Sequence, residues 1–234
     1  MQVILLAGGR GRRLLPYTTV LPKPLMPVGD YSILEVILLQ MKHFGLMDIT
    51  ISTGYLHELI CAFLSTKKNL GLDIKIIHED SPLGTIGPLH LIPDLEDSFL
   101  VMNGDILTDL NYQDLIEQHE RSNATATIAT YKREVHIDFG VIHRDQGLKI
   151  HSFQEKPVLN YEVSMGIYVF NKRILQYVPD NQAFGFDDLM KVLIERNEEV
   201  YSYPYDGFWL DIGRPDDYER SILEFEQNKI KFIP

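Results

Sequence analysis

Short apolar runs alternate with stretches of helical periodicity through the first half of the chain. The runs occupy Val3–Leu6, Ile49–Thr53, Ile74–His78 and Phe99–Met102. Uninterrupted apolar runs of this length are typical of strands buried on both faces of a mostly parallel sheet. The stretches between them carry apolar residues on one helical face, first at Ile33, Leu34, Ile37, Leu38, Met41 and Phe44, and next at Leu59, Ile60, Phe63 and Leu64. The pattern therefore predicts the order β-α-β-α-β-α-β.

The second half of the chain has more closely spaced strands, which favours partly antiparallel pairing. We expect a helix from about Tyr112 to Arg121, then strands at Ala124–Tyr131, around Phe139–His143 and at Val163–Phe170. A further helix is expected to start at Asp187, whose carboxylate suits an N-cap, and a last helix follows Pro215. These elements predict an α/β fold with a mixed, mostly parallel sheet flanked by helices, in a single domain over residues 1–234.

Composition narrows the class of protein. The 234 residues are 45% hydrophobic, which is enough for one sizeable core, and the net charge of −11 disfavours nucleic acid and anionic membrane surfaces as partners. No apolar segment approaches the roughly 20 residues needed to cross a bilayer, and the N-terminal run is too short for a secretory signal. With a single cysteine, Cys61, no intrachain disulfide can form. We expect a cytoplasmic enzyme that acts on small molecules.

The first 29 residues differ from this acidic background, because they contain four cations and no carboxylate. The apolar run at Val3–Leu6 ends in the sequence Ala-Gly-Gly-Arg-Gly-Arg-Arg-Leu, and Lys23 follows between two prolines. Glycines allow backbone N–H groups to approach an anion, and the cations supply charge. Leu14 stands where a dinucleotide fingerprint needs its third glycine, and the Walker pattern is absent. The segment therefore predicts a different kind of triphosphate site.

Motifs along nearly the whole chain resemble those of the sugar-1-phosphate nucleotidyltransferase family. They are Leu6-Ala7-Gly8-Gly9-Arg10-Gly11, Arg13-Leu14, Pro22-Lys23-Pro24-Leu25, Pro82-Leu83-Gly84-Thr85, Asn103-Gly104-Asp105, Phe139-Gly140, Glu155-Lys156-Pro157, Gly166-Ile167-Tyr168 and Trp209-Leu210-Asp211-Ile212-Gly213. The resemblance implies a Rossmann-like fold of the nucleotide-diphospho-sugar transferase type. Residues 1–122 would form the nucleotide-binding half and residues 123–234 the sugar-binding half. The hexapeptide repeats of a C-terminal β-helix are absent from the sequence.

The resemblance also implies a reaction in which a nucleoside triphosphate and a sugar 1-phosphate, with Mg²⁺, give a nucleoside-diphosphate sugar and pyrophosphate. Attack of one phosphate on another needs charge neutralisation more than acid–base chemistry. Arg13 would hold the β- and γ-phosphates, Lys23 the α-phosphate, and Lys156 the sugar phosphate. Asp105 and Asp211 would ligate the Mg²⁺. The alternative is that both acids merely cap turns.

Further residues are assigned to the two substrates by the same resemblance. The nucleotide would be bound by Leu6, Ala7, Gly8, Gly9, Gly11, Glu79, Gly84 and Thr85, and the sugar by Gly140, Glu155 and Ser164. A Glu79 carboxylate offers only acceptors, which suit the N–H donors of guanine and favour GTP. Alternatively, Glu79 is a solvated strand end, and Glu155 belongs to an ordinary surface turn.

Several alternatives stay open at this point. The base could be a pyrimidine, as in a thymidylyltransferase, and Arg12 either contacts phosphate or faces solvent. A glycosyltransferase that consumes nucleotide sugars normally carries an Asp-x-Asp pair, but Ile106 and Leu107 follow Asp105. A catalytically silent nucleotide-sugar-binding subunit is disfavoured by the intact Arg13 and Lys23. The sequence leaves the oligomeric state undetermined, including whether the chain forms a homo-oligomer.

Overall fold

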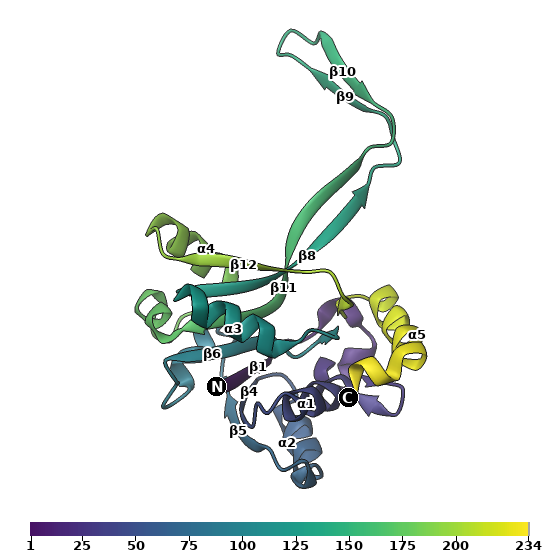
Figure 1. Ribbon diagram of the computed structural model, residues 1–234. Helices are drawn as coiled ribbons and strands as arrows, with labels where there is room; N and C mark the ends of the chain where they lie inside the picture. The colour runs from purple at the N-terminus through teal and green to yellow at the C-terminus, as the bar shows by residue number, and fades with distance from the viewer. Residues whose placement is uncertain (234) are drawn as a thin grey trace.

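A seven-stranded sheet forms the centre of the computed structural model, which describes residues 1–233 (Figure 1). Its strands are β1 (Gln2–Ala7), β4 (Asp48–Thr53), β5 (Asp73–His78), β6 (Ser98–Asn103), β8 (Ala126–His136), β11 (Val158–Asn171) and β12 (Val200–Tyr205). They lie in the order β12-β8-β11-β6-β1-β4-β5. Strands β6, β1, β4 and β5 pair in parallel, as do β8 and β12, whereas β11 is antiparallel to both of its neighbours. The predicted mixed, mostly parallel sheet is confirmed.

The other elements are short strand pairs and helices. The paired strands are β2 (Pro27–Val28) with β3 (Tyr31–Ser32), β7 (Ile106–Thr108) with β13 (Trp209–Asp211), and β9 (Val141–Arg144) with β10 (Ile150–Gln154). The α-helices are α1 (Ile33–His43), α2 (His57–Ser65), α3 (Tyr112–Ser122), α4 (Phe186–Glu195) and α5 (Pro215–Phe232). Short 3₁₀ helices cover Arg12–Leu14, Tyr17–Thr19, Lys23–Leu25, Lys68–Leu70, Gly87–Leu91 and Lys172–Tyr177. No helix within residues 1–233 is both long and apolar enough to cross a membrane.

Two helix predictions are wrong in detail. The connection from β5 to β6 forms only the 3₁₀ helix Gly87–Leu91 in place of a third α-helix, because glycine and proline recur through this segment and interrupt helical hydrogen bonding. Helix α4 begins at Phe186, so Asp187 lies inside its first turn and is not the N-cap. The cap is Gly185, whose N–H donates to the Asp188 carboxylate at 3.1 Å. Asp188, three residues after the cap, therefore supplies the third-position half of a capping box, and no side chain acts as the N-cap acceptor expected of Asp187.

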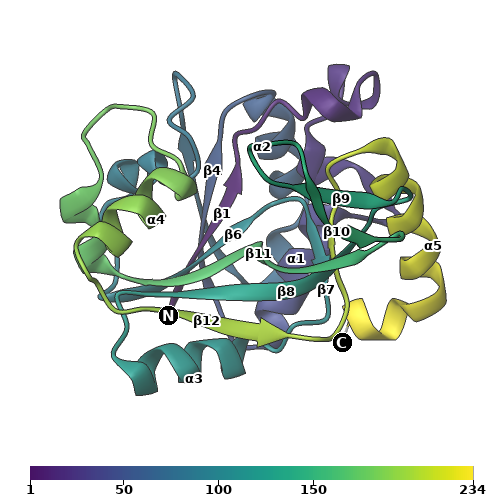
Figure 2. The ribbon, with the colours of Figure 1, turned by 90° about the horizontal axis from the view of Figure 1, so that it is seen from above.

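The two faces of the sheet carry separate hydrophobic clusters. Successive residues of β1 point to opposite faces, so that Val3 and Leu5 join one cluster and Ile4 the other. The first cluster includes apolar residues of α1, α2, α3 and α5, and the second includes those of α4 and of the 3₁₀ helix Gly87–Leu91. Figure 2 shows α4 on one side of the sheet and α1 and α2 on the other. Strands β1, β4 and β6 are therefore buried on both faces, as their apolar runs predict. Strand β5 lies at the edge of the sheet and is mostly exposed, so the prediction of a buried strand at Ile74–His78 is wrong.

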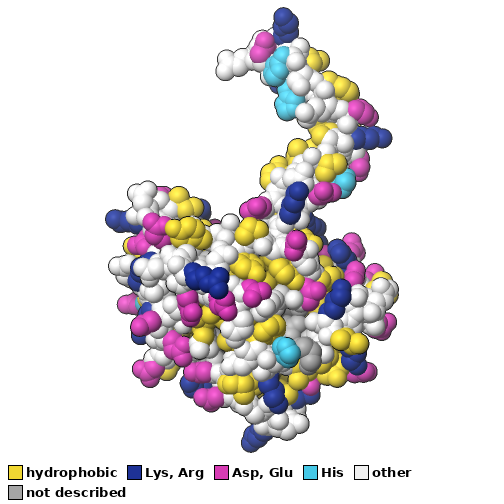
Figure 3. All heavy atoms as spheres, in the orientation of Figure 1, with side chains coloured by type: hydrophobic (Ala, Val, Ile, Leu, Met, Phe, Trp, Pro, Cys, Tyr) yellow, Lys and Arg dark blue, Asp and Glu magenta, His cyan; other side chains and the backbone are white. Residues whose placement is uncertain are grey.

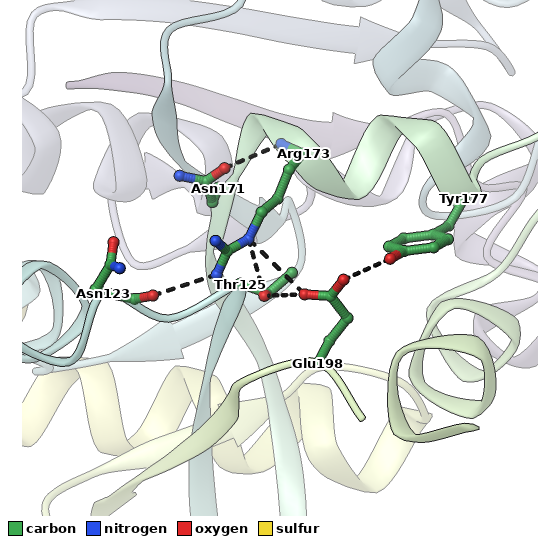
Figure 4. Close-up of polar contacts among 6 residues, drawn as sticks. All are labelled: Asn123, Thr125, Asn171, Arg173, Tyr177 and Glu198. Atoms are coloured by element: carbon green, nitrogen blue, oxygen red, sulfur yellow. Dashed lines mark hydrogen bonds and ion pairs between the residues drawn. The ribbon is translucent and has the colours of Figure 1, made fainter. Parts of the chain in front are cut away.

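A polar network joins the chain at the amino ends of β8 and β12 (Figure 4). Thr125 donates to Glu198 at 2.5 Å and accepts from Arg173 at 2.9 Å, and the Tyr177 hydroxyl donates to the other Glu198 oxygen. These bonds, the one from Thr125 first, lower the pKa of Glu198. Asn171 accepts a hydrogen bond from the Arg173 backbone N–H. The network therefore lies at the end of the sheet opposite to the carboxyl ends of β1, β4 and β6.

A two-stranded arm leaves the sheet at the other edge. It consists of residues 132–162, in which the ends of β8 and β11 continue as a paired ribbon that leads into the hairpin β9–β10. Figure 1 shows the arm directed away from the body of the molecule. The strand expected around Phe139–His143 is therefore present as β9, but it belongs to this arm and not to the central sheet.

Candidate active site

A cavity of about 540 Å³ lies at the carboxyl ends of β1, β4 and β6. It is lined by Leu6, Ala7, Gly8, Gly9, Arg10, Lys23, Pro24, Gly54, Tyr55, His78, Glu79, Asp80, Pro82, Gly84, Thr85, Asn103, Gly104 and Asp105. In parallel α/β sheets, ligands bind outside the carboxyl ends of the strands. The cavity therefore contains most of the residues that the sequence assigns to a nucleotide, together with Lys23 and Asp105.

Three glycines make the cavity wall with bare backbone. Each follows the end of a strand, namely β1 for Gly8, β4 for Gly54 and β6 for Gly104. A Cβ atom on Gly8 would lie 2.7 Å from Oε1 of Glu79, and one on Gly54 would lie 2.9 Å from the Gly8 carbonyl oxygen. Such distances are too short for real side chains. The close approach of these strand ends requires glycine, and it leaves backbone groups open to a ligand.

Glu79 is held in a fixed orientation beside Gly8. Its backbone N–H donates to the Thr53 carbonyl oxygen at 2.8 Å, which continues the pairing of β5 with β4. Its carboxylate accepts from the Ser52 hydroxyl at 2.6 Å and from the Leu83 N–H at 3.2 Å. A carboxylate has about four lone-pair sites, so these two bonds leave acceptor capacity for a ligand. The interpretation of Glu79 as a mere solvated strand end does not describe this anchored side chain.

The turn at Gly84 and Thr85 forms another part of the wall. Gly84 has φ of +80°, and a Cβ atom there would lie 2.6 Å from the Phe184 carbonyl oxygen, so that only glycine fits. The Thr85 hydroxyl accepts from the Phe186 N–H at 2.8 Å, at the start of α4. The turn is thus fixed to the second half of the chain, although it follows β5 in the first half.

Lys23 lies between two carboxylates at the base of the cavity. Its ammonium group donates to Oδ2 of Asp105 and lies 3.7 Å from Oδ1 of Asp211. Pro22 and Pro24 flank it, and the 3₁₀ helix Lys23–Leu25 sets its direction. The other Asp105 oxygen, Oδ1, is buried without a hydrogen-bond partner. A buried, unpaired carboxylate oxygen is costly, and its position beside a second acid fits a bound cation.

Arg13 reaches the same group of charges. Its guanidinium lies beside Gly213. A Cβ atom on Gly213 would lie 3.1 Å from Nη2 of Arg13 and 3.5 Å from Oδ2 of Asp211, so the guanidinium and this carboxylate both border the same glycine. Burial and the neighbouring Asp105 raise the pKa of Asp211, and the cations Lys23 and Arg13 oppose this effect. The structure therefore brings together Arg13, Lys23, Asp105 and Asp211, four residues separated by up to 198 positions in the chain.

Ser164 lies at the base of the arm, close to this cluster. Its hydroxyl donates to the Tyr168 hydroxyl at 3.2 Å and accepts from the Gly166 N–H at 3.2 Å. Burial raises the pKa of Tyr168 to about 12, and the charges of Asp105 and Asp211 act in the same direction. Trp209, on β13, donates its indole N–H to the Met165 carbonyl oxygen at 2.9 Å. This contact fixes the backbone next to Ser164, in keeping with a packing role for the tryptophan.

Seven candidate residues do not line the cavity. Three of them, Arg13, Ser164 and Asp211, have been described above, and the other four lie elsewhere. Gly140, Glu155 and Lys156 lie on the arm, where all three are exposed. Gly11 has φ of +59° and starts the 3₁₀ helix Arg12–Leu14, and the Thr18 hydroxyl donates to its carbonyl oxygen at 2.9 Å. Gly11 therefore shapes the turn that carries Arg13, and the three arm residues stand apart from the charged cluster of their own chain.

Sequence reasoning missed part of the cavity. Arg10 lies over the ring of Tyr55 at 5.6 Å from its centroid, and both residues line the cavity together with Gly54. The available signal was the position of Gly54 and Tyr55 directly after β4, because β4 is the parallel neighbour of β1 and ends at the same edge. Arg12 is exposed.

A cavity at the carboxyl ends of a mostly parallel sheet is the usual place for ligands in α/β proteins. The family model described as "Nucleotidyl transferase" matches residues 2–228, and the chain belongs to this family. The family predicted from the motifs is thereby confirmed.

Curated relatives match almost the whole chain. A mannose-1-phosphate guanyltransferase of Yarrowia lipolytica is 32% identical over 226 residues, which are 93% of this chain and 62% of the relative. A UTP–glucose-1-phosphate uridylyltransferase of Synechocystis is 30% identical over 253 residues, which are 100% of this chain and 65% of the relative. The chain thus spans less than two thirds of the length of these relatives.

A solved structure supports the fold. The crystal structure of HddC from Yersinia pseudotuberculosis complexed with GMP-PN has a TM-score of 0.73 and 23% sequence identity, and the match covers 96% of this chain and 99% of HddC. The predicted Rossmann-like fold of the nucleotide-diphospho-sugar transferase type is confirmed.

Proposed function

We propose that this chain transfers a nucleoside monophosphate from a nucleoside triphosphate to a sugar 1-phosphate and releases pyrophosphate. A phosphate oxygen of the sugar 1-phosphate attacks the α-phosphorus, and the bond between that phosphorus and the bridging oxygen of the departing pyrophosphate breaks. The family and the named activities of the relatives support this reaction class. The observation that carries the proposal is the contact of Lys23 with Asp105, whose second oxygen is buried and unpaired, at the base of a cavity walled by glycines.

The cations of the site act on the phosphates. Lys23 neutralises charge at the α-phosphorus, where it increases as the attacking oxygen approaches. Arg13, with its planar fork of donors, holds the β- and γ-phosphates and so orients the leaving group. Lys23 is held in place before substrate binds by its flanking prolines and by Asp105, and the guanidinium of Arg13 lies beside Gly213. Positioning of this kind lowers the barrier without acid–base chemistry.

Asp105 and Asp211 are the residues that would hold a Mg²⁺ ion, which supplies charge neutralisation to the phosphates when bound. Mg²⁺ is usually held by one or two carboxylates, with substrate phosphates and waters as its other ligands. Within residues 1–233 no group of three or more His, Cys, Asp and Glu side chains is placed to hold a metal. Two acids and a triphosphate together fit the ion better than the protein side chains alone.

For the base, we propose guanine. The Glu79 carboxylate is oriented by Ser52 and by the Leu83 N–H, and its free lone pairs can accept from the N1–H and N2–H₂ groups of guanine. The Yarrowia relative is named as a guanyltransferase and the Synechocystis relative as a uridylyltransferase, so UTP is the second candidate. Uracil offers a mixed donor and acceptor edge, which pairs less well with a carboxylate.

For the sugar 1-phosphate, we propose that Lys156 contacts the phosphate and Glu155 the hydroxyl groups, with Gly140 leaving room for the ring. Ser164 contributes from the base of the arm. These roles follow from the motif resemblance, and the hydrogen bond from Ser164 to Tyr168 supports the inclusion of Ser164.

The test is a matrix of four nucleoside triphosphates against a panel of hexose and heptose 1-phosphates, with released pyrophosphate measured by a coupled assay. We expect release only when both substrates and Mg²⁺ are present, with GTP the best triphosphate. A clear preference for UTP or dTTP would reject the pairing of Glu79 with guanine while leaving the reaction class intact. A protein that binds nucleotide sugars but releases no pyrophosphate with any pair would instead be a silent binding subunit.

A further inference from the structure

The arm exposes an unusual amount of apolar surface. None of residues 132–162 is buried, and Phe139, Leu148 and Phe153 are 78%, 67% and 60% exposed. Figure 3 shows apolar side chains along the arm and at its base. An isolated two-stranded hairpin is only marginally stable in water, and contiguous apolar surface marks a site of association. The arm therefore needs a surface to cover it.

The body of the same chain cannot supply that surface without a break in the ribbon. The register of β8 with β11 is continuous from Ser164 and Thr130 to Val158 and His136, and the irregularity lies on the sheet side of Ser164. At about 3.3 Å per residue, six steps place Val158 roughly 20 Å along the strand from Ser164. Lys156 lies two residues further. To return to its own cavity, the arm would have to break several of these paired hydrogen bonds.

A matching apolar surface lies next to the cavity. Leu15, Tyr17 and Val20, which we call the rim patch, are 56%, 51% and 74% exposed. The rim patch is joined to the cavity, since the hydroxyl of the cavity residue Tyr55 donates to the Thr19 carbonyl oxygen at 3.1 Å. An arm that covered the rim patch would bring its own residues over the cavity mouth.

The distribution of charge favours contact between the arm of one copy of the chain and the body of a second copy. Residues 132–162 contain five Lys and Arg and five Asp and Glu, so the rest of the chain carries the entire net charge of −11. Two acidic bodies repel each other, whereas a neutral arm can approach an acidic body without this penalty. An exchange of arms therefore joins two copies through the one part of each that is not acidic.

We propose that two copies of this chain exchange arms about a two-fold axis, so that each active site combines the cavity of one copy with Glu155 and Lys156 of the other. The role of these two residues rests on the proposed function. A reciprocal exchange of this kind is closed, because each copy gives one arm and receives one, and it buries the arm and the rim patch together. Lys23 and Lys156 then reach the same substrate from different chains.

Heterodimers with separated substitutions test the exchange. A chain with Lys23→Ala and a chain with Lys156→Ala, each with its own tag, are coexpressed, and the heterodimer is purified over both tags. Exchange gives one site with both lysines and one with neither, so the heterodimer should recover about half of the wild-type activity. Each homodimer should fall about 10²-fold. A heterodimer that stays at the homodimer level overturns the proposal, because both sites then lack one lysine.

The reverse arrangement gives the matched control. A chain with both Lys23→Ala and Lys156→Ala is paired with a wild-type chain. Exchange leaves each site with one missing lysine, so this heterodimer should be as inactive as the single-variant homodimers. If each chain used its own arm, the wild-type chain would keep its site and the heterodimer about half of the activity. That result would also overturn the exchange.

A cross-link tests the exchange without any catalysis. In a Cys61→Ser background, Phe153→Cys is placed in one chain and Val20→Cys in the other, and a short bismaleimide is added. We expect a covalent dimer, and none when Met47→Cys replaces Val20→Cys, because Met47 precedes β4 at the opposite edge of the sheet. No covalent dimer, with a monomer in sedimentation, overturns the exchange. If the wild-type protein releases no pyrophosphate with any pair of triphosphate and sugar 1-phosphate, the proposed function is wrong. The cross-link then decides by itself whether the arms are exchanged.

Discussion

The stability of this protein should fall on mild acidification because of one buried histidine. His119, on α3, is 2% exposed, and its Nδ1 lies 2.9 Å from the Thr127 hydroxyl oxygen. Burial lowers its pKa from 6.5 to about 4, and the charge of Arg173 adds to the effect. The folded protein therefore holds His119 neutral at pH values where the unfolded chain protonates it.

The sign and size of the effect follow from linkage. The stabilisation is fully present above pH 6.5 and is lost progressively as the pH falls to about 4, since the unfolded state binds one more proton in this window. The difference between the two pKa values corresponds to about 3 kcal/mol, at about 1.4 kcal/mol for each unit. The lowered pKa of Glu198 adds a separate loss that begins only near its ordinary value of 4.5. The range from pH 6.5 to pH 5 therefore reports mainly on His119.

The assay is urea unfolding followed by circular dichroism at several pH values from 7.5 to 4.5. His119→Asn keeps a polar group close to Thr127 but cannot titrate, so its free energy of unfolding should change less with pH than that of wild type. His151→Asn, on the exposed arm, is the matched control and should keep the wild-type slope. An equal slope for His119→Asn and wild type between pH 6.5 and pH 5 would refute the reasoning.

Three further predictions concern the cavity. Gly84→Ala should lower the free energy of unfolding by at least about 2 kcal/mol, because the added Cβ atom meets the Phe184 backbone and the residue has a strained positive φ. Gly45→Ala, where φ is +72° and the space is open, should lower it by only about 1 kcal/mol in the same thermal unfolding assay. Lys23→Ala should lower turnover about 10² to 10³-fold, and near-normal turnover would exclude its role at the α-phosphate. Glu79→Gln should narrow the ratio of kcat/KM for GTP over UTP by about tenfold, and an unchanged ratio would show that the base lies elsewhere.

Much of the fold follows from local pattern. The apolar runs at Val3–Leu6 and Phe99–Met102 lie in strands buried on both faces, since a parallel sheet has no other way to cover them. The segment between β5 and β6 was harder, because the alternating order of strands and helices favoured an α-helix there, whereas its glycines and prolines interrupt helical hydrogen bonding. The prediction of Asp187 as the N-cap of α4 was also wrong. The helix begins one residue earlier than expected, with Gly185 as its N-cap and Asp188 at the third position of the capping box.

The site also contains some residues whose positions could be predicted from the sequence and others whose positions could not. Lys23 and Asp105 were assigned to one site by the family motifs, and the position of Asp105 after β6, at the carboxyl ends of the parallel strands, supports its assignment. Glu155 and Lys156 could not be placed, because their motif specifies a role but not the direction of a ribbon. That direction depends on the pairing of β8 with β11, which is a long-range contact without a local signal. Arg10 was missed because its stacking on Tyr55 joins two turns that are adjacent only in space.

The antiparallel course of β11 has one last consequence. Since β8 leaves the sheet and β11 returns beside it, both junctions of the arm are hydrogen-bonded neighbours, with Cα atoms about 5 Å apart. An insertion between them can lengthen, shorten or change sequence without stretching any strand of the core. The arm can therefore be replaced without disturbing the central sheet. A chimera that carries the arm of a relative should fold, and its selectivity among sugar 1-phosphates should change.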